Sequence, residues 1–397
     1  MRVAIFAETF LPKWDGVANT VCHLLEYLAA NGHESLMIAP EGAPSRYAAT
    51  PIHGCPCFAL PMYPALRLVT PRPGLGTEIL DFRPDIVHLV NPALLGISGL
   101  HRARELGVPV VASYHTDLPG YLEKYNLTAF RDFVWNYFRW LHNQADLNLC
   151  PTRFIRRQLA DHGFERLEIW GRGVDSHVFT PERRSLEWRL KLTDGHANAP
   201  LLLYVGRLAV EKRVEVLRPL LTELPDVRLA IVGDGPERGR LEALFAGTNT
   251  VFTGYLRGDD LTAAYAAGDI FVFPGENETF GNVVLEAMAS GLPALVASHS
   301  GLKDHTINGW NGFQFEPGNS AQLATLVRWL LGDPEYRARL AANALTYARG
   351  LTWEQNLSGL MGHYERLIAG HQGQQTQPMQ TAAARAAGWL APQPPRT

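Results

Sequence analysis

The chain has 397 residues, of which 46% are hydrophobic and 19% are charged, and its formal net charge is −3 at pH 7. This length suggests two globular domains, and the nearly balanced charge argues against a strongly basic nucleic-acid-binding protein. No apolar run reaches the roughly 18 residues that a membrane-spanning helix needs. The start, MRVAIFAETF, enters a strand directly and lacks a signal-peptide pattern. Cys22, Cys55, Cys57 and Cys150 show no metal-binding spacing, so we expect reduced thiols in a cytoplasmic protein.

Short apolar runs alternate with amphipathic stretches along the first half of the chain. The runs read RVAIFAE, SLMIAP, DIVHLVN, VPVVASYH, ADLNLCPT and LEIWGRGVD. After the first run, apolar residues from Val17 to Leu28 recur at helical spacing, and Gly32 is placed to end that helix. Continuous apolar strands that alternate with helices indicate a parallel sheet covered on both faces.

The alternation breaks at residues 176–198, a charged and strand-poor segment that we interpret as a linker, and then restarts with LLLYVGR, VRLAIVGD, VFTGY, IFVFPG and PALVAS. The sequence thus predicts an α/β protein of two Rossmann-like, doubly wound parallel-sheet domains, 1–175 and 176–370. The last helix of this part fits either domain, and residues 371–397 have the composition of a disordered tail. Ligands bind beyond the carboxyl ends of parallel strands, so we expect the site in a cleft between the domains.

Two cations follow a strand in the segment YVGRLAVEK of the second domain. Arg207 can bind two phosphate oxygens at once and Lys212 adds a point charge, so the pair predicts a diphosphate clamp. The alternative is a pair of solvated surface charges. No Asp-x-Asp motif occurs, so a carboxylate-bound metal on a diphosphate is not expected.

The segment PGENETFGNVVLEAMASGLPA places two glutamates, Glu278 and Glu286, around a predicted helix start near Gly281 or Asn282. Free backbone N–H groups and the helix dipole favour a phosphate at that start. The two carboxylates would instead bind sugar and ribose hydroxyl groups. A capping glutamate plus an exposed helix glutamate is the alternative, but the apolar neighbours of Glu286 fit it poorly, because a carboxylate there needs a partner.

The first domain supplies two further candidates. A tight Asp15–Gly16 turn permits close backbone approach, and the helix that follows offers a second anion or hydroxyl site. The strand VVASYH ends with Tyr114 and His115, followed shortly by Asp117. His115 is placed to hydrogen-bond a transferred sugar, with a purely structural histidine as the alternative.

These segments together resemble the family-4 retaining glycosyltransferases of the GT-B type, over roughly residues 2–350. The motifs that carry the resemblance are DGVANTV, GRGVD, VGRLAVEK, VGDGP and ENETFGNVVLEAMASGLP, and the Glu-x7-Glu pattern in the last is the most specific. The resemblance implies a donor site in which Glu278 contacts the sugar and Glu286 holds the ribose hydroxyls.

The same resemblance implies the remaining roles. Arg207 and Lys212 bind the diphosphate, and the backbone near Phe280, Gly281 and Asn282 cradles a phosphate. Gly16 lies near the reacting phosphate, and His115 contacts the sugar near its 6-position. The catalytic set is His115, Arg207, Lys212 and Glu278, and the acceptor or membrane side is assigned to Asp15, Tyr114, Asp117 and Trp135.

Within the family, SYHTDLPGYLEKY and LHNQADLNLCPT are similar to sulfoquinovosyl- and mannosyltransferases that act on diacylglycerol-type lipids. This implies retaining transfer of a hexose from a UDP- or GDP-sugar to such a lipid, forming an α-glycosidic bond without a metal or other cofactor. Two features leave the donor sugar open. The plant and cyanobacterial sulfolipid enzymes more often have histidine at the position of Asp117, and Arg172 is more like the mannosyltransferase-type members. A GDP-mannose-dependent α-mannosyltransferase, a glycan acceptor, a nucleotide-sugar epimerase and a binding module without catalysis are the alternatives.

The helix TAFRDFVWNYFRWLHN bears on membrane contact. Its predicted core stripe consists of Phe130, Val134, Tyr137, Phe138 and Leu141. Trp135 falls off that stripe, near two arginines, as suits a protein that touches the inner face of the plasma membrane. The alternative is a core helix with one solvent-exposed tryptophan.

Overall fold

The computed structural model describes residues 1–60, 63–70, 74, 77–120 and 131–389. The chain divides into two compact units that interleave along the sequence. Unit 1 comprises Met1–Ser113, Leu141–Asn148 and Leu357–Thr397, and unit 2 comprises Tyr114–Trp140 and Leu149–Asn356. The domain boundaries derived from the sequence stay a prediction.

Unit 1 is built on a parallel sheet. Its strands lie in the order β8-β7-β1-β2-β4-β3, and only the pairing of β3 with β4 is antiparallel. The bounds are β1 (Arg2–Ala7), β2 (Glu34–Pro40), β3 (Arg46–Tyr47), β4 (Thr50–Cys55), β7 (Ile86–Val90) and β8 (Val110–Ser113). Residues Val3–Ala7 of β1 are all buried, as expected for a central strand covered on both faces. A separate antiparallel pair joins β5 (Cys57–Leu60) and β6 (Tyr63–Val69).

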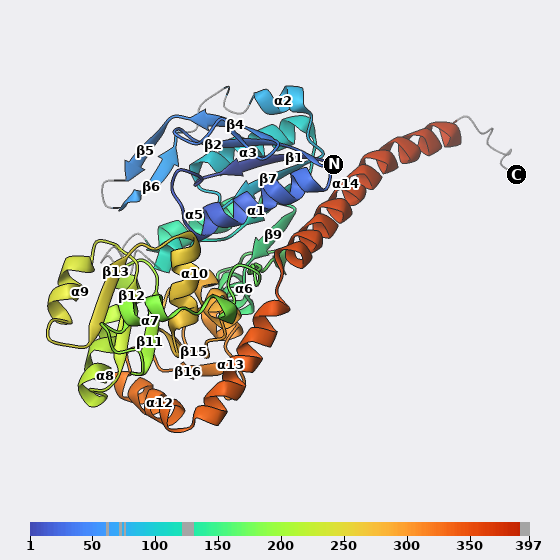
Figure 1. Ribbon diagram of the computed structural model, residues 1–397. Helices are drawn as coiled ribbons and strands as arrows, with labels where there is room; N and C mark the ends of the chain where they lie inside the picture. The colour runs from blue at the N-terminus through green and yellow to red at the C-terminus, as the bar shows by residue number, and fades with distance from the viewer. Residues whose placement is uncertain (61–62, 71–73, 75–76, 121–130, 390–397) are drawn as a thin grey trace, which may run out of the picture. The chain divides into compact units, whose positions relative to one another are not determined.

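Three helices lie beside this sheet (Figure 1): α1 (Gly16–Ala30), α2 (Glu78–Phe82) and α3 (Leu94–Leu106). The predicted apolar stripe of α1 is buried, from Val17 to Leu28. Gly32 follows its end with a φ of 70°, a conformation that glycine adopts without strain. The sequence therefore located both the face and the end of α1.

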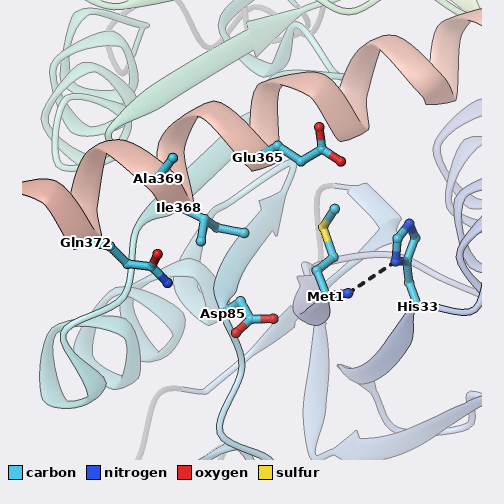
Figure 2. Close-up of a pocket in the computed structure, with 7 residues that line it drawn as sticks. All are labelled: Met1, His33, Asp85, Glu365, Ile368, Ala369 and Gln372. Atoms are coloured by element: carbon cyan, nitrogen blue, oxygen red, sulfur yellow. Dashed lines mark hydrogen bonds between the residues drawn. The ribbon is translucent and has the colours of Figure 1, made fainter.

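The long helix α14 (Trp353–Trp389) contributes Leu357–Trp389 to unit 1. The Tyr364 hydroxyl lies 2.5 Å from Nδ1 of the buried His88, whose Nε2 lies 2.8 Å from the Ser113 hydroxyl. Figure 2 shows α14 beside the amino terminus, where Met1 and Glu365 border a hollow of ≈370 Å³. The prediction of a disordered tail for 371–397 falls partly outside the described residues and stays a prediction.

Unit 2 is built on a second sheet, with all strands parallel in the order β13-β12-β11-β14-β15-β16. The bounds are β11 (Leu201–Val205), β12 (Arg228–Val232), β13 (Thr250–Gly254), β14 (Ile270–Phe273), β15 (Ala294–Ala297) and β16 (Gly312–Phe315). Strands β11 and β14 are neighbours at the centre of this sheet. On one side β11 is followed by β12 and β13, and on the other side β14 is followed by β15 and β16. The loops after β11 and β14 therefore leave the sheet side by side, at the point where ligands bind in such folds.

The remaining elements of the described chain complete the fold. They are β9 (Leu147–Cys150), β10 (Leu167–Ile169), α5 (Arg131–His142), α6 (Arg153–Asp161), α7 (Leu186–Leu192), α8 (Arg218–Glu223), α9 (Arg238–Leu244), α10 (Gly258–Ala267), α11 (Asn282–Ala289), α12 (Ser320–Gly332) and α13 (Pro334–Arg349). Short 3-10 turns are η2 (Pro181–Arg183), η3 (Val210–Lys212), η4 (Val214–Leu217) and η5 (Gly301–Asp304). No described helix has both the length and the apolarity that crossing a membrane requires.

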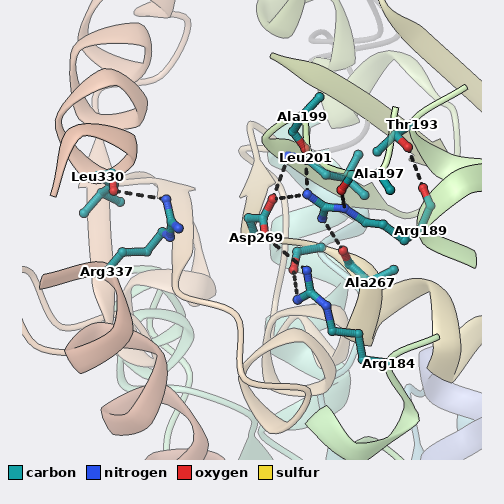
Figure 3. A network of polar contacts seen from close by, with 11 residues as sticks. Arg184, Arg189, Thr193, Ala197, Ala199, Leu201, Ala267, Asp269, Leu330 and Arg337 are labelled. Atoms are coloured by element: carbon teal, nitrogen blue, oxygen red, sulfur yellow. Dashed lines mark hydrogen bonds and ion pairs between the residues drawn. The ribbon is translucent and has the colours of Figure 1, made fainter. Parts of the chain in front are cut away.

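The segment 176–198, interpreted above as a linker, carries η2 and α7 and packs into unit 2. The buried Arg189 of α7 donates to the backbone oxygens of Ala197, Ala199 and Ala267 and lies 2.7 Å from the Asp269 carboxylate (Figure 3). Two of these partners, Ala267 and Asp269, are distant from Arg189 in sequence, so composition alone does not predict the contacts.

We expect Arg189→Met to lower the free energy of unfolding by roughly 3 to 5 kcal/mol, because it removes the buried cation that pairs with Asp269 and the donor to three backbone carbonyl oxygens. Urea unfolding measures the loss. Arg184→Met is the matched control, since Arg184 also pairs with Asp269 but its side chain is 51% exposed, against 8% for Arg189. Equal losses in the two variants would contradict this account.

Candidate active site

Helix α11 begins at a glycine, which has no side chain with which to cap it. This N-cap, Gly281, has a φ of 82°, and no described side chain hydrogen-bonds to the first turn. A β-carbon on Gly281 would lie 1.8 Å from Cδ2 of Leu302. Glycine is therefore required by both conformation and space, and it leaves the helix start open to an anion. The sequence placed this start correctly.

Lys212 and Glu278 form an ion pair that joins the loops after β11 and β14. Burial by itself would lower the pKa of Lys212, but Glu278, followed by the smaller contributions of Tyr204 and Glu211, outweighs it and leaves that pKa above its usual value. Lys212 therefore stays cationic in a site where its side chain is only 11% exposed. Arg207 also follows β11; it is half-buried, and its backbone oxygen accepts a hydrogen bond from Tyr204 at 3.1 Å.

Glu286 faces α10 from the second turn of α11. Its Oε2 accepts a 2.7 Å hydrogen bond from the Tyr265 hydroxyl. This hydrogen bond offsets part of the cost of placing a carboxylate among apolar side chains. Burial of the carboxylate raises the pKa of Glu286 to about 7, and the Tyr265 hydrogen bond lowers it by less. The residue as a whole is half-buried.

His115 lies in a buried cluster with Arg172 and the loop before α11. Its backbone oxygen accepts a 2.7 Å hydrogen bond from Thr279, and its Nδ1 lies 3.1 Å from Nη2 of Arg172. Arg172 also reaches Oδ1 of Asn282 at 3.4 Å, and its guanidinium carbon lies 5.4 Å from the centre of the Phe280 ring. The structure thus places three of the predicted site residues, His115, Phe280 and Asn282, around Arg172.

Two residues of this cluster were not among the predicted site residues. Arg172 follows β10 in the GRGVD segment, and its position after a strand end was the available signal. His305 has no sequence signal; its ring lies 4.4 Å from that of Phe280, and burial, followed by the charge of Arg172, lowers its pKa to about 4. His305 is therefore a neutral group beside the start of α11.

Tyr114 and Asp117 lie together, with the Tyr114 hydroxyl donating to Asp117 Oδ1 at 3.1 Å. Asp117 and Glu278 both border a cavity of ≈410 Å³ within unit 2. Other described side chains around it include Trp135, Phe154, Gln158 and Glu276. The carboxylates could accept hydrogen bonds from hydroxyl groups of a bound molecule.

The expected exposure of Trp135 is wrong. Its ring is buried, stacked on His162 with centroids 3.7 Å apart, and contacts Phe164 edge to face. The residues that cover Trp135 follow α6, which helical periodicity within α5 does not reveal. The role assigned to Trp135 at the acceptor or membrane stays a prediction.

The other residues of α5 follow the expected stripe in part. Phe138 and Leu141 are buried, and Val134 and Tyr137 are half-buried. Phe130 lies outside the described residues. The exposed aromatic rings of α5 are instead those of Phe133 and Trp140, which the periodicity did not single out.

Asp15 and Gly16 lie in unit 1, at the start of α1. The Asp15 carboxylate accepts hydrogen bonds from the amides of Val17 and Ala18 at 3.0 and 2.9 Å. This helix start therefore already holds a carboxylate, unlike that of α11, and an external anion would have to displace it. The roles assigned to Asp15 and Gly16 and the cleft between the domains stay predictions.

Comparison with known proteins bears on what such a site does. Residues 14–178 match the model of glycosyltransferase family 4, and residues 194–346 match that of glycosyl transferases group 1. A GDP-mannose-dependent alpha-mannosyltransferase of Mycolicibacterium smegmatis is 40% identical over 375 residues, which are 93% of this chain and 98% of that protein. The chain belongs to the family-4 glycosyltransferases. A sulfoquinovosyl transferase of Arabidopsis thaliana is 38% identical, over 89% of this chain and 71% of that protein.

The fold of this glycosyltransferase resembles that of solved structures. Sucrose-phosphate synthase from Thermosynechococcus elongatus superposes with a TM-score of 0.76 at 22% identity, covering 93% of this chain and 99% of that one. The predicted α/β class, two Rossmann-like parallel-sheet domains of the GT-B type, is confirmed. The prediction of a hexosyltransferase is likewise confirmed by the family and its members.

Proposed function

We propose that this glycosyltransferase moves a hexose from a UDP- or GDP-sugar to a membrane lipid such as diacylglycerol, with retention of the α configuration. The observation that carries the proposal is the Lys212–Glu278 pair, which sits between two strand-end loops of the sheet that also present the uncapped start of α11. A cation and free amides suit a diphosphate, and a carboxylate suits sugar hydroxyls.

The donor is held as follows in this proposal. Arg207, Lys212 and the amides at Gly281 and Asn282 bind the diphosphate. Glu286, already bonded to Tyr265 through one oxygen, accepts from a ribose hydroxyl. Lys212 can engage the diphosphate only by loosening its contact with Glu278, which then becomes available to the hydroxyl groups of the sugar.

The transfer itself uses charge stabilisation rather than a protein nucleophile. As the bond to the diphosphate breaks, the cations and amides stabilise the negative charge that develops on the leaving oxygen. That oxygen takes the proton of the acceptor hydroxyl, which attacks the same face of the sugar. Glu278 and Glu286 thereby differ from the acid and nucleophile of a glycosidase, and no metal is given a role.

Exposed aromatic residues on α5 support a membrane acceptor. Phe133 is 69% exposed and Trp140 is 51% exposed, and the exposed Arg131 and Arg139 lie on the same helix. Aromatic rings flanked by arginines suit the interface of an anionic bilayer. The proposal therefore places the enzyme in the cytoplasm, peripherally at the inner face of the plasma membrane.

We expect the double variant Phe133→Ser/Trp140→Ser to bind vesicles containing anionic phospholipid roughly tenfold more weakly than the wild type, because two interfacial rings are lost. Vesicle co-sedimentation measures the binding. Tyr255→Ser, which removes a 65% exposed ring elsewhere on unit 2, should bind as the wild type does. Unchanged binding of the double variant would refute the assigned surface.

A second candidate is transfer of mannose from GDP-mannose to a lipid or glycan. It is favoured by the 40% identity to a protein named as a GDP-mannose-dependent alpha-mannosyltransferase. Sulfoquinovose is the corresponding alternative from the Arabidopsis relative. Incubating the purified protein with UDP- and GDP-linked hexoses and a panel of lipid and glycan acceptors decides between the donors.

The test of the main proposal is the lipid extract of a host that expresses the chain, analysed by mass spectrometry for new glycolipids. The same host expressing Lys212→Ala is the control. A new α-glycolipid that depends on Lys212 supports the proposal, and its absence with a competent donor rejects the lipid acceptor. Isomerised nucleotide sugar without acceptor would indicate an epimerase, and donor binding without any turnover would indicate a binding module.

A further inference from the structure

The contact between Arg172 and His115 constrains where the imidazole carries its proton. A guanidinium group has only N–H donors and no acceptor. With Nη2 of Arg172 3.1 Å from Nδ1 of His115, that nitrogen must accept the hydrogen bond. The single ring proton of a neutral imidazole then sits on Nε2, and a second proton on Nδ1 would point at the cation.

We propose that Arg172 is a positioning residue that holds His115 in its neutral, Nε2-protonated form, so that His115 donates a hydrogen bond to an oxygen of the donor sugar. This inference rests on the proposed function, in which His115 contacts that sugar. It assigns the donor and the acceptor of this contact: the histidine N–H donates the hydrogen bond and the sugar oxygen accepts it.

The surroundings of Arg172 fix its guanidinium in the required place. Arg172 is buried, 5% exposed, and lies over the Phe280 ring while reaching Asn282 at the first position of α11. The Thr279 hydroxyl, on the same loop, bonds the backbone oxygen of His115. Both partners of the Arg172–His115 contact are therefore tied to the loop between β14 and α11.

Among the described residues, ionisable groups lie on several segments around His115. Arg172 contributes from the segment after β10, and Glu278 precedes Thr279 in the loop before α11. Asp117 lies on the segment of His115 itself, where it is bonded to Tyr114, and His305 faces the Phe280 ring. Arg172 hydrogen-bonds the His115 ring directly, so its removal should change the histidine.

A double-mutant cycle tests whether Arg172 acts through His115. Arg172→Met should lower kcat/KM for sugar transfer roughly tenfold at pH 7. His115→Gln retains an amide donor without a titrating ring, and in that background Arg172→Met should cost less than about twofold. Additive losses in the double variant would overturn the inference, because they would mean that Arg172 acts elsewhere in the site.

The pH profile supplies a readout that a merely structural role would not move. Arg172→Met should acquire an added acid limb near the usual imidazole pKa of about 6.5, as His115 becomes free to protonate. Arg172→Lys, which keeps a cationic donor, should lack that limb, and so should the control Arg184→Met. An acid limb in the lysine variant as well, or none in the methionine variant, would contradict the proposal.

Imidazole nitrogen NMR makes the test independent of turnover. In the wild type, the His115 signals, assigned by their loss in His115→Gln, should show a neutral ring with an unprotonated Nδ1 at pH 7. A protonated Nδ1 would sink the inference even in an active enzyme. Conversely, the expected tautomer with no sugar transfer to any acceptor would reject the proposed function while the Arg172–His115 relation stands.

Discussion

Lys212→Ala is expected to lower kcat/KM for hexose transfer about 100- to 1000-fold, a loss typical of removing one preorganised group that stabilises developing charge. Lys212 is a buried cation that pairs with Glu278, the carboxylate assigned to the sugar. Its removal takes charge from the diphosphate and leaves the Glu278 carboxylate with less compensation. Steady-state kinetics with the competent donor measure the effect.

Two controls separate catalysis from folding in that experiment. Lys191→Ala removes an exposed lysine of α7 that pairs with Glu187, and it should leave kcat/KM within about twofold of the wild type. Lys212→Arg keeps the charge and should recover part of the loss. Full activity of Lys212→Ala would remove Lys212 from the donor site, and with it the main support for the proposed function.

Gly281→Ala is expected to weaken donor binding more than tenfold and to lower the free energy of unfolding by roughly 2 to 5 kcal/mol. An alanine would have to adopt a φ near 82°, and its β-carbon would overlap Leu302. The start of α11 would shift, and with it the amides offered to a phosphate. Calorimetric titration with UDP and GDP and urea unfolding measure the two effects.

The matched control for this variant is Gly239→Ala in α9. Beyond the adjacent residues and the backbone of α9 itself, no described atom lies within 4 Å of a β-carbon built there, and the position is helical, so alanine should be neutral or slightly stabilising. If Gly281→Ala unfolds the protein, nucleotide binding cannot be read from it, and Leu302→Ala/Gly281→Ala relieves the overlap while keeping the strained φ. Wild-type nucleotide affinity in a folded Gly281→Ala variant would show that the helix start does not bind the diphosphate.

The features that the sequence predicts well are those whose signal is local. The buried strands appear as continuous apolar runs, and the start of α11 follows from Gly281 and the apolar pattern after it. Lys212 and Glu278 were predicted from their places after strands, and the parallel order of β11 and β14 explains why they meet. Parallel strands bring their carboxyl ends to one edge, which turns sequence position into spatial position.

What the sequence could not show depends on partners from distant segments. Trp135 is buried because His162 and Phe164 cover it. Glu286 is tolerated among apolar residues because the Tyr265 hydroxyl of α10 donates a hydrogen bond to it. In both cases the deciding contact is made by a side chain whose direction is not encoded in a motif. Asp15 differs, because its carboxylate accepts from amides two and three residues away, a contact that an N-cap aspartate before a helix indicates locally.

The interleaving of the two units has a consequence for any attempt to dissect the protein. The backbone passes from one unit to the other at Ser113–Tyr114, Trp140–Leu141, Asn148–Leu149 and Asn356–Leu357. A single scission after residue 175 would therefore give an amino-terminal fragment carrying His115 and Arg172 and a carboxyl-terminal fragment carrying Thr279 and Asn282, which bond to them. Neither fragment alone would hold a complete unit, so we expect co-expression and reassembly of both pieces to be needed before either acquires a native nucleotide pocket.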